Sequence, residues 1–141
     1  MKLNQQLVQI NRNFVICFIV SALSSAAIAQ ILSDTENYIN TTVTVAIGYA
    51  IYFVVFAILF WFDNKNRYRQ MHGSLIKREI IAMISSFGIG EIGYLIVRWP
   101  TFYYFLEINI EPFFASLTSE IIATIGYMVI VTIFLRKTKT F

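Results

Sequence analysis

Four long apolar stretches alternate with short polar segments along the chain. They cover residues 14–32, 42–62, 80–104 and 113–135, and the first two contain no charged residue. At a rise of about 1.5 Å per residue, each can cross a hydrocarbon core of about 30 Å. Helices are expected, because open strands leave backbone groups unpaired in lipid. The pattern predicts an all-α, polytopic membrane protein with four transmembrane helices in a single domain, residues 1–141.

Composition supports this interpretation and excludes several kinds of site. Hydrophobic residues make up 57% of the 141 residues and charged residues only 13%, whereas a soluble domain is about half apolar and a quarter charged. The single cysteine, Cys17, and the single histidine, His72, exclude an intrachain disulfide and a metal site built on several His or Cys ligands. No nucleophile–base motif or phosphate-binding loop is present. We therefore expect neither an enzyme nor a bound cofactor.

Basic residues gather in alternate polar segments. The connecting segments 33–41 and 105–112 contain Asp and Glu but no Lys or Arg, whereas segment 63–79 and both tails are basic. The positive-inside rule then places both termini in the cytoplasm, as expected for a multi-pass protein of the cell membrane. Topology also explains the basic cluster at 65–69, so we expect no nucleic-acid partner. The basic residues outside the apolar stretches are Lys2, Arg12, Lys65, Arg67, Arg69, Lys77, Arg78, Arg136, Lys137 and Lys139.

The first apolar stretch has an alternative interpretation as a cleaved signal peptide. Ala27-Ile28-Ala29 before Gln30 is similar to a signal-peptidase site that follows a basic start and an apolar core. Cleavage after Ala29 would leave three helices and an external N-terminus. We expect the segment to be retained.

Three charged residues lie within the apolar stretches: Glu91, Arg98 and Glu120. A charge at the centre of a membrane helix costs about 2.5–3.5 kcal/mol on insertion scales, so each needs a reason. Glu120 lies about 10 Å into the fourth stretch, at a depth comparable to that of Arg98, which predicts a neutralising pair. Glu91 lies deeper, near the bilayer centre, where protonation would lower its cost.

These charges support two interpretations. In the functional one, they form a polar site in the bundle that binds a head group or relays a proton. In the structural one, Arg98 reaches outward to the interface, and the carboxylates bond to other helices or to partner subunits. Ser116, Thr124 and Tyr127 share one helical face with Glu120. For this polar stripe we favour contact between helices over the lining of a cavity.

Small residues recur at helical spacing and predict close helix packing. We expect these faces to contact other transmembrane helices, within this chain, in a homo-oligomer or in a larger complex, while the remaining surface contacts membrane lipids. The faces are Ser21, Ser25 and Ala29 with Ala22 and Ala26, then Ser86, Gly90 and Gly93, and finally Ala115, Ser119 and Ala123.

The chain divides into two hairpins, residues 1–70 and 71–141, of equal orientation, as in a parallel repeat. This doubled hairpin resembles the GtrA-like family of small four-helix membrane proteins. Arg12-Asn13-Phe14-Val15-Ile16 is similar to the family's basic-then-apolar start, and Phe134-Leu135-Arg136-Lys137 with Phe141 to its end. The family's usual early glycine is absent from Val20-Ser21-Ala22-Leu23-Ser24.

The resemblance implies translocation of polyprenyl-linked sugars for cell-surface glycan synthesis. This hypothesis predicts a cavity between the helices with Glu91 or Glu120 facing into it. The alternative hypothesis is a non-catalytic accessory subunit of a larger membrane complex, for example an ammonia- or methane-monooxygenase-type enzyme. Its basis is the small soluble mass, the lack of catalytic motifs and the small-residue faces.

Overall fold

The computed structural model describes residues 2–137. Within the helices, the side chains of residues 2–7, 10, 79–80, 82–87, 89, 131–132 and 134–137 are not described. Phe141, which contributes to the family resemblance, and the side chain of Ser86, which belongs to one predicted packing face, therefore lie outside the described residues.

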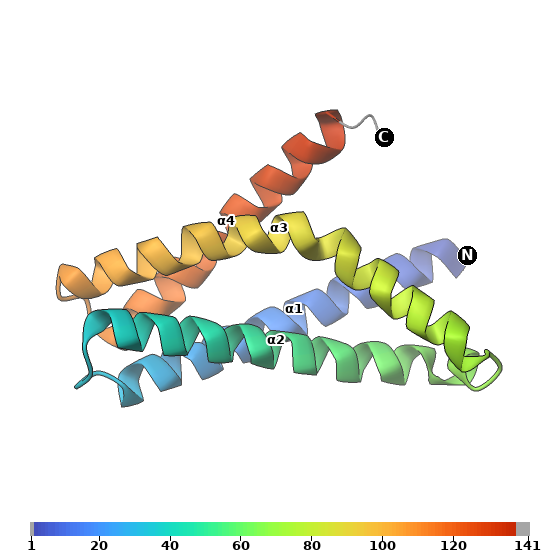
Figure 1. Ribbon diagram of the computed structural model, residues 1–141, viewed down its shortest axis with the longest axis horizontal. Coiled ribbons are helices and arrows are strands. Elements are labelled where there is room, and N and C mark those ends of the chain that lie inside the picture. Colours follow the sequence, from blue (N-terminus) through green and yellow to red (C-terminus); the bar gives the residue numbers. More distant parts are fainter. Residues whose placement is uncertain (1, 138–141) are drawn as a thin grey trace.

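Four helices connected by short turns make up the fold (Figure 1): α1 (Lys2–Ile31), α2 (Asn37–Tyr68), α3 (Gly73–Glu107) and α4 (Pro112–Lys137). The described part of the chain contains no strand, so the predicted all-α class is confirmed. The helices extend beyond the apolar stretches, most clearly where α1 begins and where α2 ends. Polar residues such as Lys, Arg and Gln have favourable helix propensities, so the helix continues into water after the apolar pattern stops.

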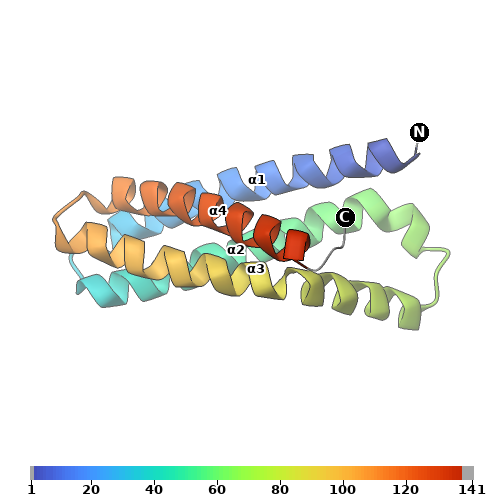
Figure 2. The same cartoon turned by 90° about the horizontal axis from the view of Figure 1, so that it is seen from above.

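Consecutive helices run antiparallel and form a closed ring (Figures 1 and 2). Contacts join α1 to α2, α2 to α3, α3 to α4 and α4 back to α1, and among the described residues neither diagonal pair is in contact. The acidic turns 32–36 and 108–111 lie at one end of the bundle, and turn 69–72 lies near the opposite end, where α1 begins. Two of the three charges within the apolar stretches, Glu91 and Glu120, line a cavity between these helices.

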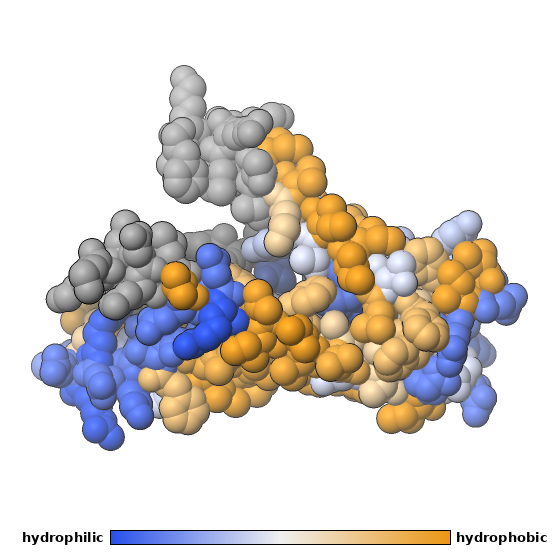
Figure 3. Space-filling model, turned by 180° about the vertical axis from the view of Figure 1, so that it is seen from behind, coloured by the Kyte–Doolittle hydropathy of each residue, from blue (hydrophilic) through white to orange (hydrophobic). Residues whose placement is uncertain are grey.

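The long helices give the molecule a largely apolar surface. Asn11–Ile31, Asn37–Tyr68 and Pro112–Ile130 are each long and apolar enough to cross a membrane, in a search restricted to the described residues. Figure 3 shows an apolar band between two hydrophilic ends. Large apolar side chains such as Leu23, Ile96 and Ile125 are exposed. In water this surface would be unstable, so the chain is a multi-pass membrane protein.

Small residues let α1 and α2 approach closely. Ser21, Ser25 and Ala29 are buried, as their spacing predicts. The Ser21 hydroxyl donates a hydrogen bond of 2.9 Å to the carbonyl oxygen of Gly48. A Cβ atom added to Gly48 would overlap the Oγ atom of Ser25. Glycine is therefore required at position 48 by space. On α4, the predicted face of Ala115, Ser119 and Ala123 is likewise buried.

Polar contacts hold the first hairpin together at both ends. At the acidic end, the Asn40 amide donates to the carbonyl oxygens of Ala29 (3.0 Å) and Leu32 (3.2 Å). At the other end, Arg12 forms an ion pair of 2.9 Å with Asp63. Each end is therefore fixed in register by side chains that the apolar pattern does not specify.

At the acidic end, three hydrogen bonds between described residues join the two hairpins. The Asn37 amide donates to the Glu107 carboxylate (2.9 Å), and the Trp99 indole donates to the Thr42 hydroxyl (3.1 Å). The backbone N–H of Phe113 donates to the Gln30 side chain (3.4 Å). Towards the opposite end α4 diverges from the other helices (Figure 1).

We predict that Gly48→Ala lowers the free energy of unfolding by about 1–3 kcal/mol, because the new methyl group overpacks the α1–α2 contact. Adding Ser25→Ala should recover most of this loss, since the Oγ atom that blocks the space is removed and forms no hydrogen bond with any described residue. The measurement is thermal unfolding in detergent micelles, followed by circular dichroism.

Gly126→Ala is the matched control. Its Cβ atom would meet Val97 at 3.4 Å, an ordinary contact, and alanine is favoured over glycine inside a helix. This variant should be as stable as the parent or slightly more so. If Gly48→Ala and Gly126→Ala lowered the free energy of unfolding equally, the close approach of α1 and α2 at Gly48 would be contradicted.

Candidate functional site

An ion pair between α3 and α4 neutralises two of the three charges that lie within the apolar stretches. Nη1 of Arg98 contacts Oε2 of Glu120, and the two side chains are 1% and 5% exposed. The pair predicted from their comparable depth is therefore confirmed. The alternative in which Arg98 reaches outward to the interface is wrong, because its guanidinium turns inward. In a medium of low dielectric constant, a carboxylate on the neighbouring helix attracts it strongly.

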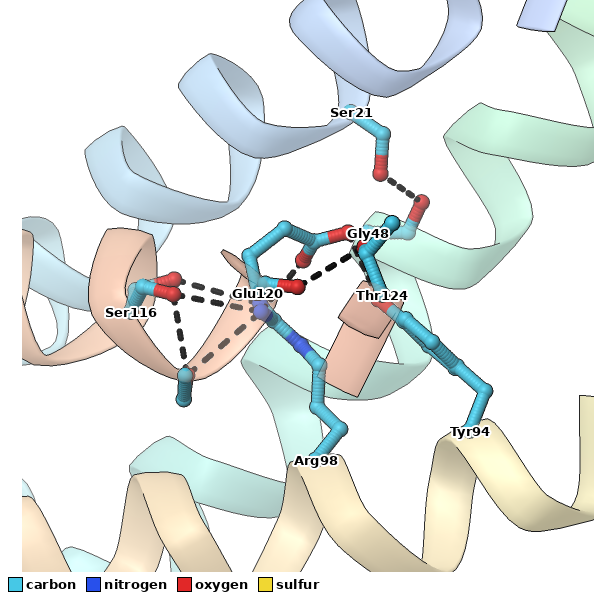
Figure 4. A network of polar contacts seen from close by, with 8 residues as sticks. Ser21, Gly48, Tyr94, Arg98, Ser116, Glu120 and Thr124 are labelled. Atoms are coloured by element: carbon cyan, nitrogen blue, oxygen red, sulfur yellow. Dashed lines mark hydrogen bonds and ion pairs between the residues drawn. The ribbon is translucent and has the colours of Figure 1, made fainter. Parts of the chain in front are cut away.

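Two serines of α4 complete the surroundings of Arg98 (Figure 4). The guanidinium donates to the carbonyl oxygen (3.1 Å) and hydroxyl (3.2 Å) of Ser116 and to the hydroxyl of Ser119 (3.4 Å). Both serines lie on the same face of α4 as Glu120. A buried guanidinium needs all of these acceptors, because each unpaired N–H group carries a desolvation cost.

Both carboxylate oxygens of Glu120 are used within the protein. Oε2 is paired with Arg98, and Oε1 accepts a hydrogen bond of 2.6 Å from the Tyr94 hydroxyl. Tyr94 was not predicted from sequence. It lies three residues after Glu91 and four before Arg98, on the same face of α3, and this spacing was the available signal. Glu120 therefore organises its neighbours and has little capacity left for a ligand.

Beside this cluster, a cavity of about 430 Å³ lies between the helices, and all four contribute to its lining. Glu91 lines it and is only partly buried. The Tyr49 side chain of α2 interacts with the Glu91 carboxylate through a hydrogen bond. The lining residues are Phe14, Val15, Phe18, Ser21, Tyr49, Tyr52, Glu91, Tyr94, Glu120, Thr124, Tyr127 and Met128.

The charges around the cavity are unbalanced. No Lys, Arg or His lines it, and the positive charge of Arg98 is matched by Glu120. Glu91 has no ion-pair partner among the described residues. No three His, Cys, Asp or Glu side chains gather into a metal-sized cluster in the part of the chain that the structure describes. The arrangement can bind a polar group inside an otherwise apolar, aromatic space.

The polar stripe predicted on the fourth helix has two separate roles. Ser116 contacts Arg98 of α3, as expected for contact between helices. Thr124 and Tyr127 line the cavity instead, and the Thr124 hydroxyl donates to the backbone carbonyl of Glu120 at 2.8 Å. The predicted contact between helices is therefore confirmed for Ser116, and it is wrong for Thr124 and Tyr127.

Comparison with protein-family models, with curated proteins and with solved structures finds no match to this chain. The resemblance to the GtrA-like family therefore stays a prediction.

We predict that Arg98→Met and Glu120→Gln each destabilise the protein by about 3–5 kcal/mol, because each leaves one buried charge without its partner. The double variant should lose much less than the sum of the two, since no unpaired charge remains. Unfolding in detergent micelles measures all three variants.

Arg12→Met is the matched control for this pair. It also removes an arginine from an ion pair, but the Arg12 side chain is 51% exposed, so the expected loss is below about 1 kcal/mol. If the double variant lost the full sum of its single variants, Arg98 and Glu120 would not be coupled.

Proposed function

We propose that this chain is a four-span protein of the cell membrane, with both termini in the cytoplasm, that moves polyprenyl-linked sugars across the bilayer as GtrA-like proteins are thought to do. The observation that carries the proposal is the cavity between the helices, with the carboxylate of Glu91 facing into it.

The distribution of charge supports the four-span topology. Turn 69–72 lies between basic helix ends, whereas turns 32–36 and 108–111 are acidic or flanked by acidic residues. α3 runs between these two ends, like the three helices whose apolar length is sufficient to span a membrane. With α3 as a fourth span, every basic turn and tail lies on one side, as the positive-inside rule requires.

The position of the cavity also supports a transport role. Its lining comes from α1 and α2 of the first hairpin and from α3 and α4 of the second. In transporters built from repeats, substrate sites lie near the bilayer midplane at the interface between the repeats. A polar site at that position shortens the distance over which a hydrophilic head group must be carried through hydrocarbon.

The accessory-subunit hypothesis has less support. One of its arguments was the number of small-residue faces available for partner subunits. The α1 and α4 faces are buried by contacts within this chain, so they are not available to bind other proteins. An accessory subunit would also have no need for a cavity lined by a carboxylate.

The topology predicts which positions can be labelled from outside the cell. In a Cys17→Ala background, Asp34→Cys and Glu111→Cys should react with a membrane-impermeant maleimide on intact cells, whereas His72→Cys should react only after permeabilisation. All three positions are exposed on the protein surface, so lack of reaction reports the membrane barrier. Labelling of His72→Cys on intact cells would contradict the proposed orientation.

The purified chain alone, reconstituted in proteoliposomes, should transport a short-chain, water-soluble analogue of polyprenyl-phosphate-glucose. Glu91→Gln should lower the initial rate at least tenfold, because it removes the one cavity carboxylate that is not paired with Arg98. Glu111→Gln is the matched control outside the cavity and should transport at the parent rate. If the parent protein alone gives no transport above empty liposomes, the transport proposal fails and an accessory role is favoured.

A further inference from the structure

Three of the hydroxyl groups around the cavity have already donated their hydrogens to the protein. Ser21 donates to the carbonyl oxygen of Gly48 (2.9 Å), Tyr94 to Oε1 of Glu120 (2.6 Å), and Thr124 to the carbonyl oxygen of Glu120 (2.8 Å). A hydroxyl group has one hydrogen and two lone pairs. Towards a ligand, these three groups can therefore only accept hydrogen bonds.

The two carboxylates in the cavity lining, Glu91 and Glu120, add further hydrogen-bond acceptors. An ionised Glu91 is also an acceptor, with no ion-pair partner among the described residues. The one arginine nearby, Arg98, is 1% exposed and does not line the cavity. The cavity thus offers many acceptors and no cation. A phosphate group is anionic, so it would meet the Glu91 carboxylate here without any cation to balance its charge.

A sugar has the complementary chemistry. Its hydroxyl groups supply donors in several directions, and the cavity presents acceptors from α1, α3 and α4. Its C–H faces are apolar, and the aromatic residues in the lining present apolar faces to them. A quaternary ammonium group matches the charge of Glu91 but has no N–H donor, so it would leave this dispersed set of acceptors unpaired.

The cavity also has an opening suited to a lipid tail. Val15 of α1 and Met128 of α4 belong to its lining, yet they are 57% and 62% exposed. They mark a lateral opening between these two helices, and Figure 3, which looks onto this side, shows the molecule hollowed beneath α4. Both residues lie within the apolar stretches, so this opening faces lipid.

We infer that the cavity binds the uncharged sugar of a lipid-linked sugar through its hydroxyl donors, while the phosphate stays outside the cavity and the prenyl chain leaves between α1 and α4. This inference rests on the proposed function and adds which part of the substrate is recognised. Selectivity against the bare lipid phosphate then comes from the Glu91 carboxylate and from the lack of a cation in the cavity lining.

Competition binding to the full chain in lipid nanodiscs tests this inference. Radiolabelled citronellyl glucoside, a neutral short-chain prenyl sugar, is displaced by unlabelled citronellyl glucoside, citronellyl phosphate or citronellyl trimethylammonium. We expect the glucoside to compete at least tenfold better than either charged compound. Glu91→Gln should weaken glucoside binding and narrow the difference between glucoside and phosphate, because a repelling charge is removed. Glu111→Gln should leave both unchanged.

Each other outcome has a definite meaning. If the phosphate competes as well as the glucoside in the parent protein, the inference is wrong, even if transport is observed. If the trimethylammonium compound competes best and loses this advantage in Glu91→Gln, the cavity is a cation site and the inference is again wrong. Glucoside-selective binding without transport in proteoliposomes would instead overturn the proposed function and leave the inference intact. The competition in the parent protein does not depend on the folding of any variant.

Discussion

The fold is organised by one constraint: a charge within hydrocarbon has no water to hydrate it. Arg98 and Glu120 meet this constraint by pairing across α3 and α4, with Ser116 and Ser119 accepting further hydrogen bonds from the guanidinium. These contacts fix the rotation of both helices about their axes. Because the rotation is fixed, Tyr94 reaches Glu120 and Glu91 turns towards the space between the hairpins. The cavity therefore depends on an ion pair that does not itself bind a ligand.

The two intramembrane carboxylates have different roles because their neighbours differ. Glu120 has an arginine and a tyrosine on its two oxygens and is almost fully buried. Glu91 has a tyrosine neighbour and open space beside it. In a bilayer the first arrangement stabilises the bundle, whereas the second retains polar capacity for another molecule. A protein this small can thus keep structural and binding functions on separate residues, Glu120 of α4 and Glu91 of α3, that line the same cavity.

The sequence predicts the existence of the helices better than their ends. Hydropathy reports where lipid surrounds the chain, whereas the helix itself continues as long as backbone hydrogen bonds do, as at residues 63–68. The sequence also identifies Glu91, Arg98 and Glu120, because charges in apolar stretches are rare. It does not identify Tyr49 or Tyr94 as their partners, nor the inward direction of Arg98. Those features depend on which helices are neighbours, and the periodicity of a single helix does not contain that information.

Three hydrogen bonds between the hairpins lie together at the acidic end, where Asn37 meets Glu107, Trp99 meets Thr42 and Phe113 meets Gln30. This end of the bundle is thereby fastened, and α4 diverges only towards the other end. The two hairpins can then tilt against each other about a pivot at the acidic end of the bundle. A small tilt of one hairpin about that pivot changes the width of the gap between α1 and α4 most at its open end. The energetic cost of such a tilt falls on the apolar contacts and on the Tyr49–Glu91 hydrogen bond, and it spares the polar bonds at the pivot.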